Sequence, residues 1–131
     1  MNLNLQVILG SGIDIIEVDR VESAREKHGE RFLKRVLHPA EMAYCLSHKF
    51  PGPFLAARFA AKEAISKAFG TGIGAQLGWQ DMEIARKDSG EPYVILHGKG
   101  LELLAQRGAR CVHITLSHLE KHATAMAILE G

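Results

Sequence analysis

The alternation of hydrophobic and polar positions predicts a β-strand at the start of the chain. Residues 7–18 are rich in β-branched residues and glycine, and successive side chains of a strand point to opposite faces. We expect this strand to end near residue 14. One face would carry Val7, Leu9, Ser11, Ile13 and Ile15, and the other would carry Ile8, Gly10, Gly12, Asp14 and Ile16.

Helical patterns follow this strand. Asp19 and Glu22 have the spacing of a capping box, which predicts a helix start. Pro39 suits the first turn of another helix, and Gly70 closes a long alanine-rich run that follows a Pro- and Gly-rich break. The expected helical segments are, in order, 20–28, 30–37, 39–48 and 54–69.

Short strand patterns dominate the second half of the chain. Turn residues at 88–90 and 119–121 connect them in pairs, which predicts two hairpins. Hairpins mixed with helices argue for an α+β class, with one domain over residues 1–131 and a mainly antiparallel sheet packed against the long central helix. The expected strands are 79–86, 93–97, 111–117 and 123–129, with a short helix at 101–106.

The composition excludes several classes of protein. The chain has 131 residues, of which 47% are hydrophobic and 24% charged, as in an ordinary globular domain. A domain of this size buries only about two-thirds of the surface exposed by its unfolded chain, which leaves apolar surface for a subunit interface. No apolar run reaches the roughly 20 residues that cross a bilayer, and residues 1–5 lack a signal-peptide pattern. We therefore expect a cytoplasmic protein without membrane contact.

The net charge of +1 gives no case for a nucleic-acid partner. Residues 20–49 nevertheless hold seven Lys or Arg against four Glu. Such a face is suited to steer an acidic partner, although a solvated helix surface is the commoner explanation. Cys45 and Cys111 lack metal-ligand spacing, and we expect two free, buried thiols.

Glu63 and Lys67 lie one turn apart on the long helix, on the side opposite its apolar stripe. The simple interpretation is a surface ion pair. Ala56, Ala60 and Ala64 beside the pair favour a packed face instead, where a carboxylate and an ammonium would line a cleft for a metal and phosphate. The apolar stripe comprises Phe54, Ala61, Ile65 and Phe69.

Asp14 also has two interpretations. A lone aspartate near a strand end is most often a turn or cap residue. Here it shares a strand face with Gly10 and Gly12, which leave room for a ligand or another backbone to approach. Asp14 and Glu63 are hard carboxylate ligands, of the kind that hold Mg²⁺ while phosphate oxygens complete its coordination.

Two other motifs give weaker signals. The glycine-rich loop 70–74 follows a helix and lacks the Gly-Lys-Ser/Thr of a phosphate loop, so a helix cap is the simpler interpretation. His113, His118 and His122 do not favour zinc, because the first two have opposite strand parity and no cysteine completes a tetrahedron. His118, at a strand end, is better placed to hydrogen-bond a phosphate or a backbone group.

Three segments together resemble the holo-[acyl-carrier-protein] synthases, a family of 4'-phosphopantetheinyl transferases. Residues 12–20, GIDIIEVDR, are similar to the opening motif of this family. Residues 58–74, RFAAKEAISKAFGTGIG, are similar to its central signature, and residues 112–118 to its closing strand with a terminal histidine. The match runs in order from about residue 8 to residue 129.

The resemblance implies a role for each matching residue. Asp14 and Glu63 match the magnesium ligands, and Lys67 matches a catalytic lysine that binds phosphate. Arg20 matches an arginine that docks an acidic helix of the carrier protein. Leu119 replaces a small hydroxyl residue that often follows the histidine, which puts one contact to the coenzyme in doubt. Contacts with coenzyme A are also implied for Arg58, Lys62, Lys67, Gly70, Gly72 and His118.

The implied reaction moves 4'-phosphopantetheine from coenzyme A to a serine of apo acyl carrier protein and releases 3',5'-ADP. Such a transfer needs charge neutralisation and alignment, which Mg²⁺ and a lysine supply. Our hypothesis for the base that accepts the serine proton is Glu63, directly or through water. Short members of the family form homotrimers with active sites between subunits, and we expect the same here.

Two other functions remain open on the residues alone. One is a protein that binds coenzyme A or a nucleotide without reaction. The other is an interaction module in which Glu63 and Lys67 form only a surface pair.

Overall fold

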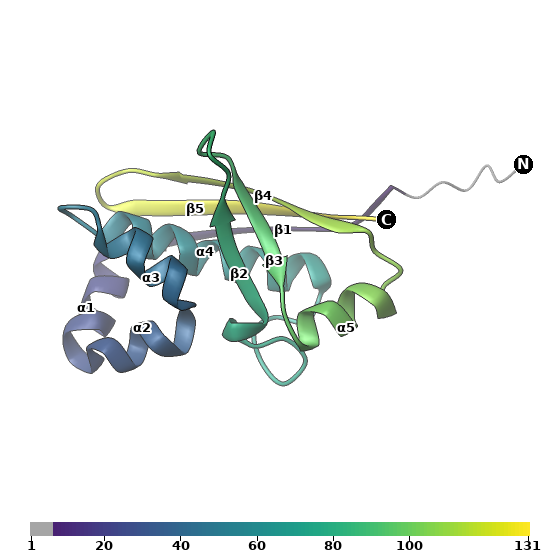
Figure 1. Ribbon diagram of the computed structural model, residues 1–131, viewed down its shortest axis with the longest axis horizontal. Helices are drawn as coiled ribbons and strands as arrows, with labels where there is room; N and C mark the ends of the chain where they lie inside the picture. The colour runs from purple at the N-terminus through teal and green to yellow at the C-terminus, as the bar shows by residue number, and fades with distance from the viewer. Residues whose placement is uncertain (1–6) are drawn as a thin grey trace, which may run out of the picture.

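One long helix, α4 (Gly52–Phe69), lies along the inner face of a three-stranded antiparallel sheet in the computed structural model, which describes residues 7–131 (Figure 1). Residues 1–5, on which part of the predicted location rests, lie outside the described residues. No helix within residues 7–131 is long and apolar enough to cross a membrane. The strand order of the sheet is β1 (Ile8–Glu17), β5 (His122–Glu130) and β4 (Cys111–His118).

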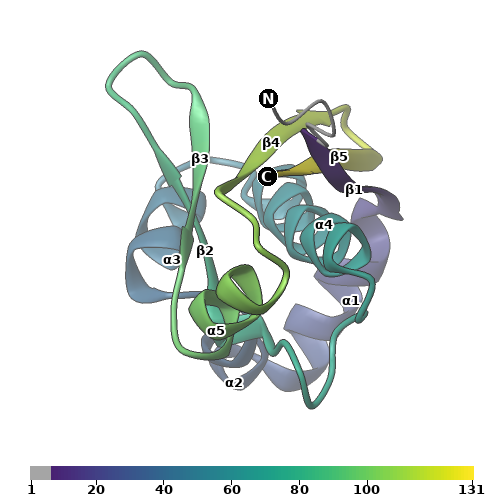
Figure 2. The ribbon, with the colours of Figure 1, turned by 90° about the vertical axis from the view of Figure 1, so that its right-hand side faces the viewer.

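The remaining elements surround the rest of α4. Figure 2 shows a second, two-stranded antiparallel sheet beside α3, with α4 between this hairpin and β1. The α+β class predicted from the sequence is therefore confirmed. The bounds of these elements are α1 (Val18–His28), α2 (Glu30–Val36), α3 (Pro39–Leu46), η1 (Trp79–Asp81), β2 (Met82–Arg86), β3 (Pro92–Leu96) and α5 (Lys99–Gln106).

The first strand and helix differ from the prediction at their junction. β1 continues past Asp14 to Glu17, because its pairing with β5 extends to the last residue of the strand. The backbone N–H of Val18 then donates to the carbonyl of Lys121 at 2.8 Å, so the helix begins there. The capping box predicted at Asp19 is wrong: the N-cap is Glu17, and no side chain caps this helix.

The predicted strand 79–86 begins three residues later than expected. Asp81 causes the delay, because one oxygen of its carboxylate accepts from Gly78 N at 2.8 Å and the other from Lys99 N at 3.2 Å. These bonds close a short 3₁₀ turn before β2. The hairpin predicted at 111–117 and 123–129 is confirmed, with its turn between β4 and β5.

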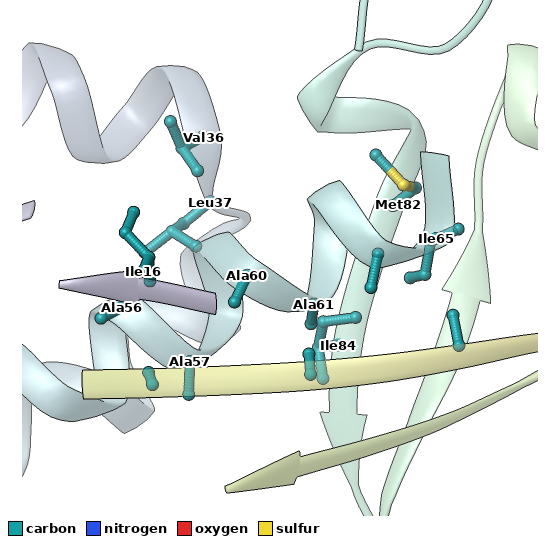
Figure 3. Packing of buried hydrophobic residues seen from close by; sticks show 14 of the residues in the cluster. Ile16, Val36, Leu37, Ala56, Ala57, Ala60, Ala61, Ile65, Met82 and Ile84 are labelled. Carbon is teal, nitrogen blue, oxygen red and sulfur yellow. The ribbon is translucent and has the colours of Figure 1, made fainter. Parts of the chain in front are cut away.

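β1 approaches α4 unusually closely because two of its inward positions are glycine. A Cβ on Gly12 would collide with the carbonyl oxygen of Ala64, and a Cβ on Gly10 would collide with that of Ala68. Small side chains on α4 complete the close contact (Figure 3). The packed alanine face predicted for this helix is confirmed, since Ala56, Ala60 and Ala64 are all 0% exposed.

The two faces of the three-stranded sheet differ sharply. Its inner face presents small and apolar side chains of β5, all buried against α4: Ala123, Ala125, Ala127 and Leu129. Its outer face carries exposed apolar side chains, with Ile13, Ile15 and Met126 at 64%, 70% and 41%. The register places Ile13 opposite Met126. The structure thus leaves the outer sheet face as an apolar surface.

Candidate active site

A cleft of about 410 Å³ opens where β1, α1 and α4 meet. It contains four residues singled out from the sequence: Asp14 on β1, Arg20 on α1, and Glu63 and Lys67 on α4. The close approach of β1 to α4 brings these segments together. The remaining wall is mainly apolar and consists of Ile15, Ile16, Val21, Ala24, Phe32 and Phe59.

Lys67 joins the two sides of the cleft. Its ammonium lies 3.1 Å from Asp14 Oδ1 and donates a hydrogen bond to the carbonyl of Ile13 at 2.9 Å. The Asp14 side chain is 17% exposed, whereas that of Lys67 is 50% exposed and open to a ligand. The principal ion-pair partner of Lys67 is therefore Asp14, and the simple Glu63–Lys67 surface pair is not formed as a contact among the described residues.

Glu63 is electrostatically strained in this cleft. Burial raises the pKa of its carboxyl, the nearby Asp14 carboxylate raises it further, and Lys67 opposes both effects. Two carboxylates in one partly desolvated cleft attract a cation, because a divalent ion would relieve their repulsion. The oxygen ligands present are those that Mg²⁺ prefers, so the donor set fits the predicted metal.

Arg20 supplies positive charge at the mouth of the cleft. Its side chain is exposed on the first turn of α1. The same helix carries Arg25, Lys27 and His28 in its last turn. An exposed arginine beside such a cleft is suited to contact an acidic partner.

Lys62 does not lie in the cleft, and the coenzyme contact implied for it does not fit this structure. Its side chain is 0% exposed, and its ammonium lies 2.9 Å from Glu41 Oε1. It also donates to the carbonyl oxygens of Val36 at 2.6 Å and Trp79 at 3.2 Å. Burial lowers the pKa of Lys62 while Glu41 opposes the shift. Lys62 is a buried structural cation that ties α4 to the segments preceding α3 and β2.

Arg58 is also enclosed. The residue is only 4% exposed, and its guanidinium carbon lies 4.4 Å from the centre of the Tyr44 ring. Its Nε is buried without a hydrogen-bond partner among the described residues, and a coenzyme contact for Arg58 stays a prediction. Sequence reasoning missed Glu41, the partner of Lys62, because a glutamate early in a helix has an ordinary capping explanation.

His118 lies in a different cleft. Its ring packs against the edge of Phe54, with centroids 4.7 Å apart, in a hollow that also includes Lys49 and Leu119. The cleft of Lys67 and the hollow of His118 are thus separate within one chain. The coenzyme role of His118 stays a prediction.

The glycine loop after α4 begins as the predicted helix cap. Gly70 adopts a left-handed conformation with φ 81°, and its N–H donates to the carbonyl of Lys67 at 3.0 Å. Gly72 also has a positive φ of 67°. This cap fixes the end of α4 one turn beyond Lys67, and a coenzyme contact for the two glycines stays a prediction.

The burial of the cysteines and the neighbours of the histidines differ in part from those predicted from the sequence. Cys45 and Cys111 are free, but only Cys45 is buried. Burial raises the pKa of the Cys45 thiol to about 11. His113 does have a neighbouring cysteine, since Cys111 Sγ lies 3.5 Å from its Nε2, and Glu130 approaches the same nitrogen at 2.7 Å. The three-histidine arrangement considered from the sequence is not formed in the described part of the chain.

Comparison with known proteins places this chain in one class. Residues 10–127 match the model of the 4'-phosphopantetheinyl transferase superfamily. The chain belongs to this family. A holo-[acyl-carrier-protein] synthase of Moorella thermoacetica is 48% identical over 124 residues, which cover 95% of each chain.

Solved structures agree with this assignment. The crystal structure of holo-[acyl-carrier-protein] synthase from Neisseria meningitidis has a TM-score of 0.87 and 31% identity, and the match covers 95% of this chain and 99% of that chain. The Helicobacter pylori holo-[acyl-carrier-protein] synthase, crystallised in complex with coenzyme A, has a TM-score of 0.81 and 30% identity over 91% of this chain and 98% of that chain.

Proposed function

We propose that this chain is a holo-[acyl-carrier-protein] synthase that transfers 4'-phosphopantetheine from coenzyme A to a serine of apo acyl carrier protein. The observation that carries the proposal is the meeting of Asp14, Glu63 and Lys67 in one cleft, within a chain 48% identical to a protein of that name. The serine oxygen bonds to the β-phosphorus of coenzyme A. The bond from that phosphorus to the 3',5'-ADP oxygen breaks.

Charge neutralisation is the main task of the cleft in this reaction. Asp14 and Glu63 would hold Mg²⁺, which when bound supplies positive charge beside the diphosphate. Lys67 remains half exposed and close to Asp14, so its ammonium can turn to a phosphate oxygen without leaving the site. It would steady the negative charge that grows on the leaving ADP.

Glu63 is the base that we propose for the serine proton. Its carboxylate lies in the cleft with Asp14 and Lys67, where it would accept the proton directly or through water. A Glu63→Gln variant is expected to lose most of its turnover. Full turnover of this variant with magnesium present would exclude the role.

Arg20 is our candidate contact for the carrier protein. It lies at the cleft, is exposed and belongs to a helix whose last turn is basic. Reversal of its charge in Arg20→Glu should raise the KM for an acidic carrier while the KM for coenzyme A changes little. An unchanged KM for the carrier would remove Arg20 from the docking surface.

We further propose that three copies assemble through the outer sheet face. Exposed Ile13, Ile15 and Met126 would be covered there, as the size of the chain and its family resemblance suggest. Assembly would also let His118 of one subunit complete the cleft of another, which would account for its distance from Lys67 within one chain.

The reaction is tested by intact-mass measurement of an apo acyl carrier protein incubated with the purified protein, coenzyme A and magnesium. The carrier should gain one phosphopantetheine, and EDTA should prevent the gain. Binding of coenzyme A without any gain on several carriers would favour a binding protein. A folded protein that binds no coenzyme A would favour an interaction module.

A further inference from the structure

Two histidines and a glutamate converge outside the cleft, at the base of the β2–β3 hairpin. His38 directly precedes α3, Glu83 lies in β2, and His97 directly follows β3. One ligand atom from each lies within 4.8 Å of the other two. His97 Nε2 is 2.8 Å from Glu83 Oε1, and His38 Nδ1 is 3.8 Å from the same oxygen. Figure 2 shows α3 and β2 side by side in this region.

The backbone holds Glu83 and His97 on one face of the hairpin. Glu83 pairs with Ile95 across the two strands, and His97 N donates to the carbonyl of Asp81 at 2.9 Å. The two side chains are therefore diagonal neighbours on the same face. Met82 and Ile84 point to the other face and are buried in the core, which fixes the register.

Hydrogen bonding decides the protonation of His38. Its Nε2 lies 2.9 Å from the carbonyl oxygen of Gln80, which can only accept, so Nε2 carries a proton. In the neutral ring, Nδ1 then has a free lone pair, and this nitrogen lies 3.8 Å from Glu83 Oε1. Protein ligands of metals have this arrangement, with one imidazole nitrogen free for the metal and the other donating to a carbonyl.

Gln80 is itself held firmly in place. Its side-chain amide donates to the carbonyls of Lys34 at 2.7 Å and Leu37 at 3.0 Å. The Gln80 carbonyl, which orients His38, is therefore held in place by hydrogen bonds from the Gln80 side chain to the end of α2 and the α2–α3 connection. The imidazoles of His38 and His97 stack with their centroids 4.6 Å apart, so both rings have defined orientations.

We propose that His38, Glu83 and His97 form a binding site for Zn²⁺. Two imidazoles and one carboxylate are a common zinc ligand set, and tetrahedral bonds of about 2.0–2.1 Å place ligand atoms about 3.4 Å apart. The separations of 2.8 and 3.8 Å from Glu83 Oε1 bracket that value, and all three ligand atoms lie within 4.8 Å of one another. The His97 side chain is 41% exposed, which leaves a fourth coordination position for water.

Charge also favours a cation at this site. With both imidazoles neutral, the group carries the single negative charge of Glu83. No lysine or arginine among residues 7–131 lies within ion-pair distance of that carboxylate, and Lys62, a cation that interacts with it over a longer distance, is paired with Glu41. Zinc binding would require the neutral His97 ring to carry its proton on Nδ1, so that Nε2 is free for the metal.

A second group, Cys111, His113 and Glu130, offers a less suitable set of ligands. Arg110 already occupies one oxygen of Glu130 at 2.8 Å, and a guanidinium beside the site repels a metal ion. The His113 side chain is 60% exposed, on the sheet face that we propose is covered in the trimer. This group therefore serves as the matched control.

The proposal is tested by titrating Zn²⁺ into the purified protein in a calorimeter. With excess Mg²⁺ present to fill the cleft of Asp14 and Glu63, the wild type should bind one equivalent of Zn²⁺. His38→Gln and His97→Gln should each weaken zinc binding by on the order of 100-fold or more, since loss of even an outer partner costs 10–100-fold. Cys111→Ser and Asp14→Asn should retain the wild-type affinity, which would separate this site from the other two groups.

A thermal measurement keeps the test independent of activity. Zn²⁺ should raise the unfolding temperature of the wild type and of Cys111→Ser, but not that of His97→Gln. Circular dichroism checks that each variant is folded, which the exposure of His97 leads us to expect. Absence of zinc binding in the wild type, or binding that survives both histidine substitutions, would overturn the proposal.

Discussion

The Glu63 carboxyl, which lies beside Asp14 in the cleft, should make the stability of the protein depend on pH and on magnesium. Burial and Asp14 raise the pKa of Glu63 above its ordinary value of 4.5, so the folded state holds this proton more tightly than the unfolded state. The contribution of Glu63 to the free energy of unfolding is therefore greatest below pH 4.5 and is lost as the pH rises through the folded-state pKa.

Urea unfolding across this pH range tests the argument. Without magnesium, the wild type should become less stable relative to Glu63→Gln as the pH rises, because the mutant keeps a neutral side chain. Excess magnesium should remove that difference by compensating the carboxylate charge. A stability difference that does not change with pH or magnesium would show that Glu63 is not strained.

Truncation of two lysines on α4 should change the free energy of unfolding by very different amounts. Lys62→Ala leaves the buried Glu41 carboxylate without its counter-ion, although the backbone N–H groups of His38 and Ile84 still donate to it, and should cost about 3–5 kcal/mol of unfolding free energy. Lys67→Ala removes a half-exposed ion pair and should change stability by less than about 1 kcal/mol. Urea titration of both variants measures the contrast. Equal losses of stability would contradict the structural role assigned to Lys62.

The difference between Lys62 and Lys67 was beyond the reach of sequence reasoning. Both lysines belong to the same signature, and helical spacing alone does not indicate that α3 and β2 cover one of them. The partner Glu41 lies 21 residues away from Lys62. By contrast, Gly10 and Gly12 did predict that a ligand or another backbone approaches the strand face that carries Asp14, but the glycines alone do not identify the long helix as that neighbour.

At the level of elements, the contact between β1 and α4 positions the site. Gly12→Ala would place a methyl group against the carbonyl oxygen of Ala64, which belongs to a buried helix and cannot move freely. We expect a loss of at least about 1–3 kcal/mol in unfolding free energy, and reduced magnesium binding because Asp14 shifts with its strand.

Ser11→Ala is the matched control for this substitution. Ser11 is exposed on the opposite face of the same strand, so its loss should leave stability and magnesium binding nearly unchanged. Chemical unfolding and calorimetry measure both variants. If Gly12→Ala were as stable as Ser11→Ala, the stability of the protein would not depend on the close approach of β1 to α4.

Most elements could be predicted because each has a local pattern. The alanine-rich periodicity gave α4 to within two residues at its start, and turn residues gave both hairpins. The errors arose at junctions where distant contacts decide. β1 extends beyond Asp14 because its pairing with β5 continues. η1 replaces the predicted start of a strand because the Asp81 carboxylate accepts hydrogen bonds from the backbone N–H groups of Gly78 and Lys99.

For the whole molecule, we expect the exposed face of the three-stranded sheet to be the interface between subunits, and substitutions on this face test that prediction. Ile13→Glu combined with Met126→Glu would place charges on opposing positions of that face. The double variant should be a monomer by light scattering, and its transferase activity should fall with the loss of the partner's His118. Zinc binding at His38, which does not depend on this face, should persist.

Leu101→Glu controls for the general effect of a surface charge. Leu101 is 55% exposed on α5, away from the sheet face, so this variant should keep the assembly of the wild type. A double variant that stays assembled would place the interface elsewhere. Full activity in a monomeric variant would instead contradict the proposed completion of the site by His118 of the partner subunit.

The central claim is that the cleft of Asp14, Glu63 and Lys67 transfers phosphopantetheine, and the most direct test is the initial rate of 3',5'-ADP release with an apo carrier, coenzyme A and magnesium. Lys67→Ala should lower kcat on the order of 10²–10³-fold, as removal of a group that stabilises transition-state charge does. Lys34→Ala, an exposed lysine on α2, should keep the wild-type rate. A Lys67→Ala protein with the wild-type kcat would contradict the account.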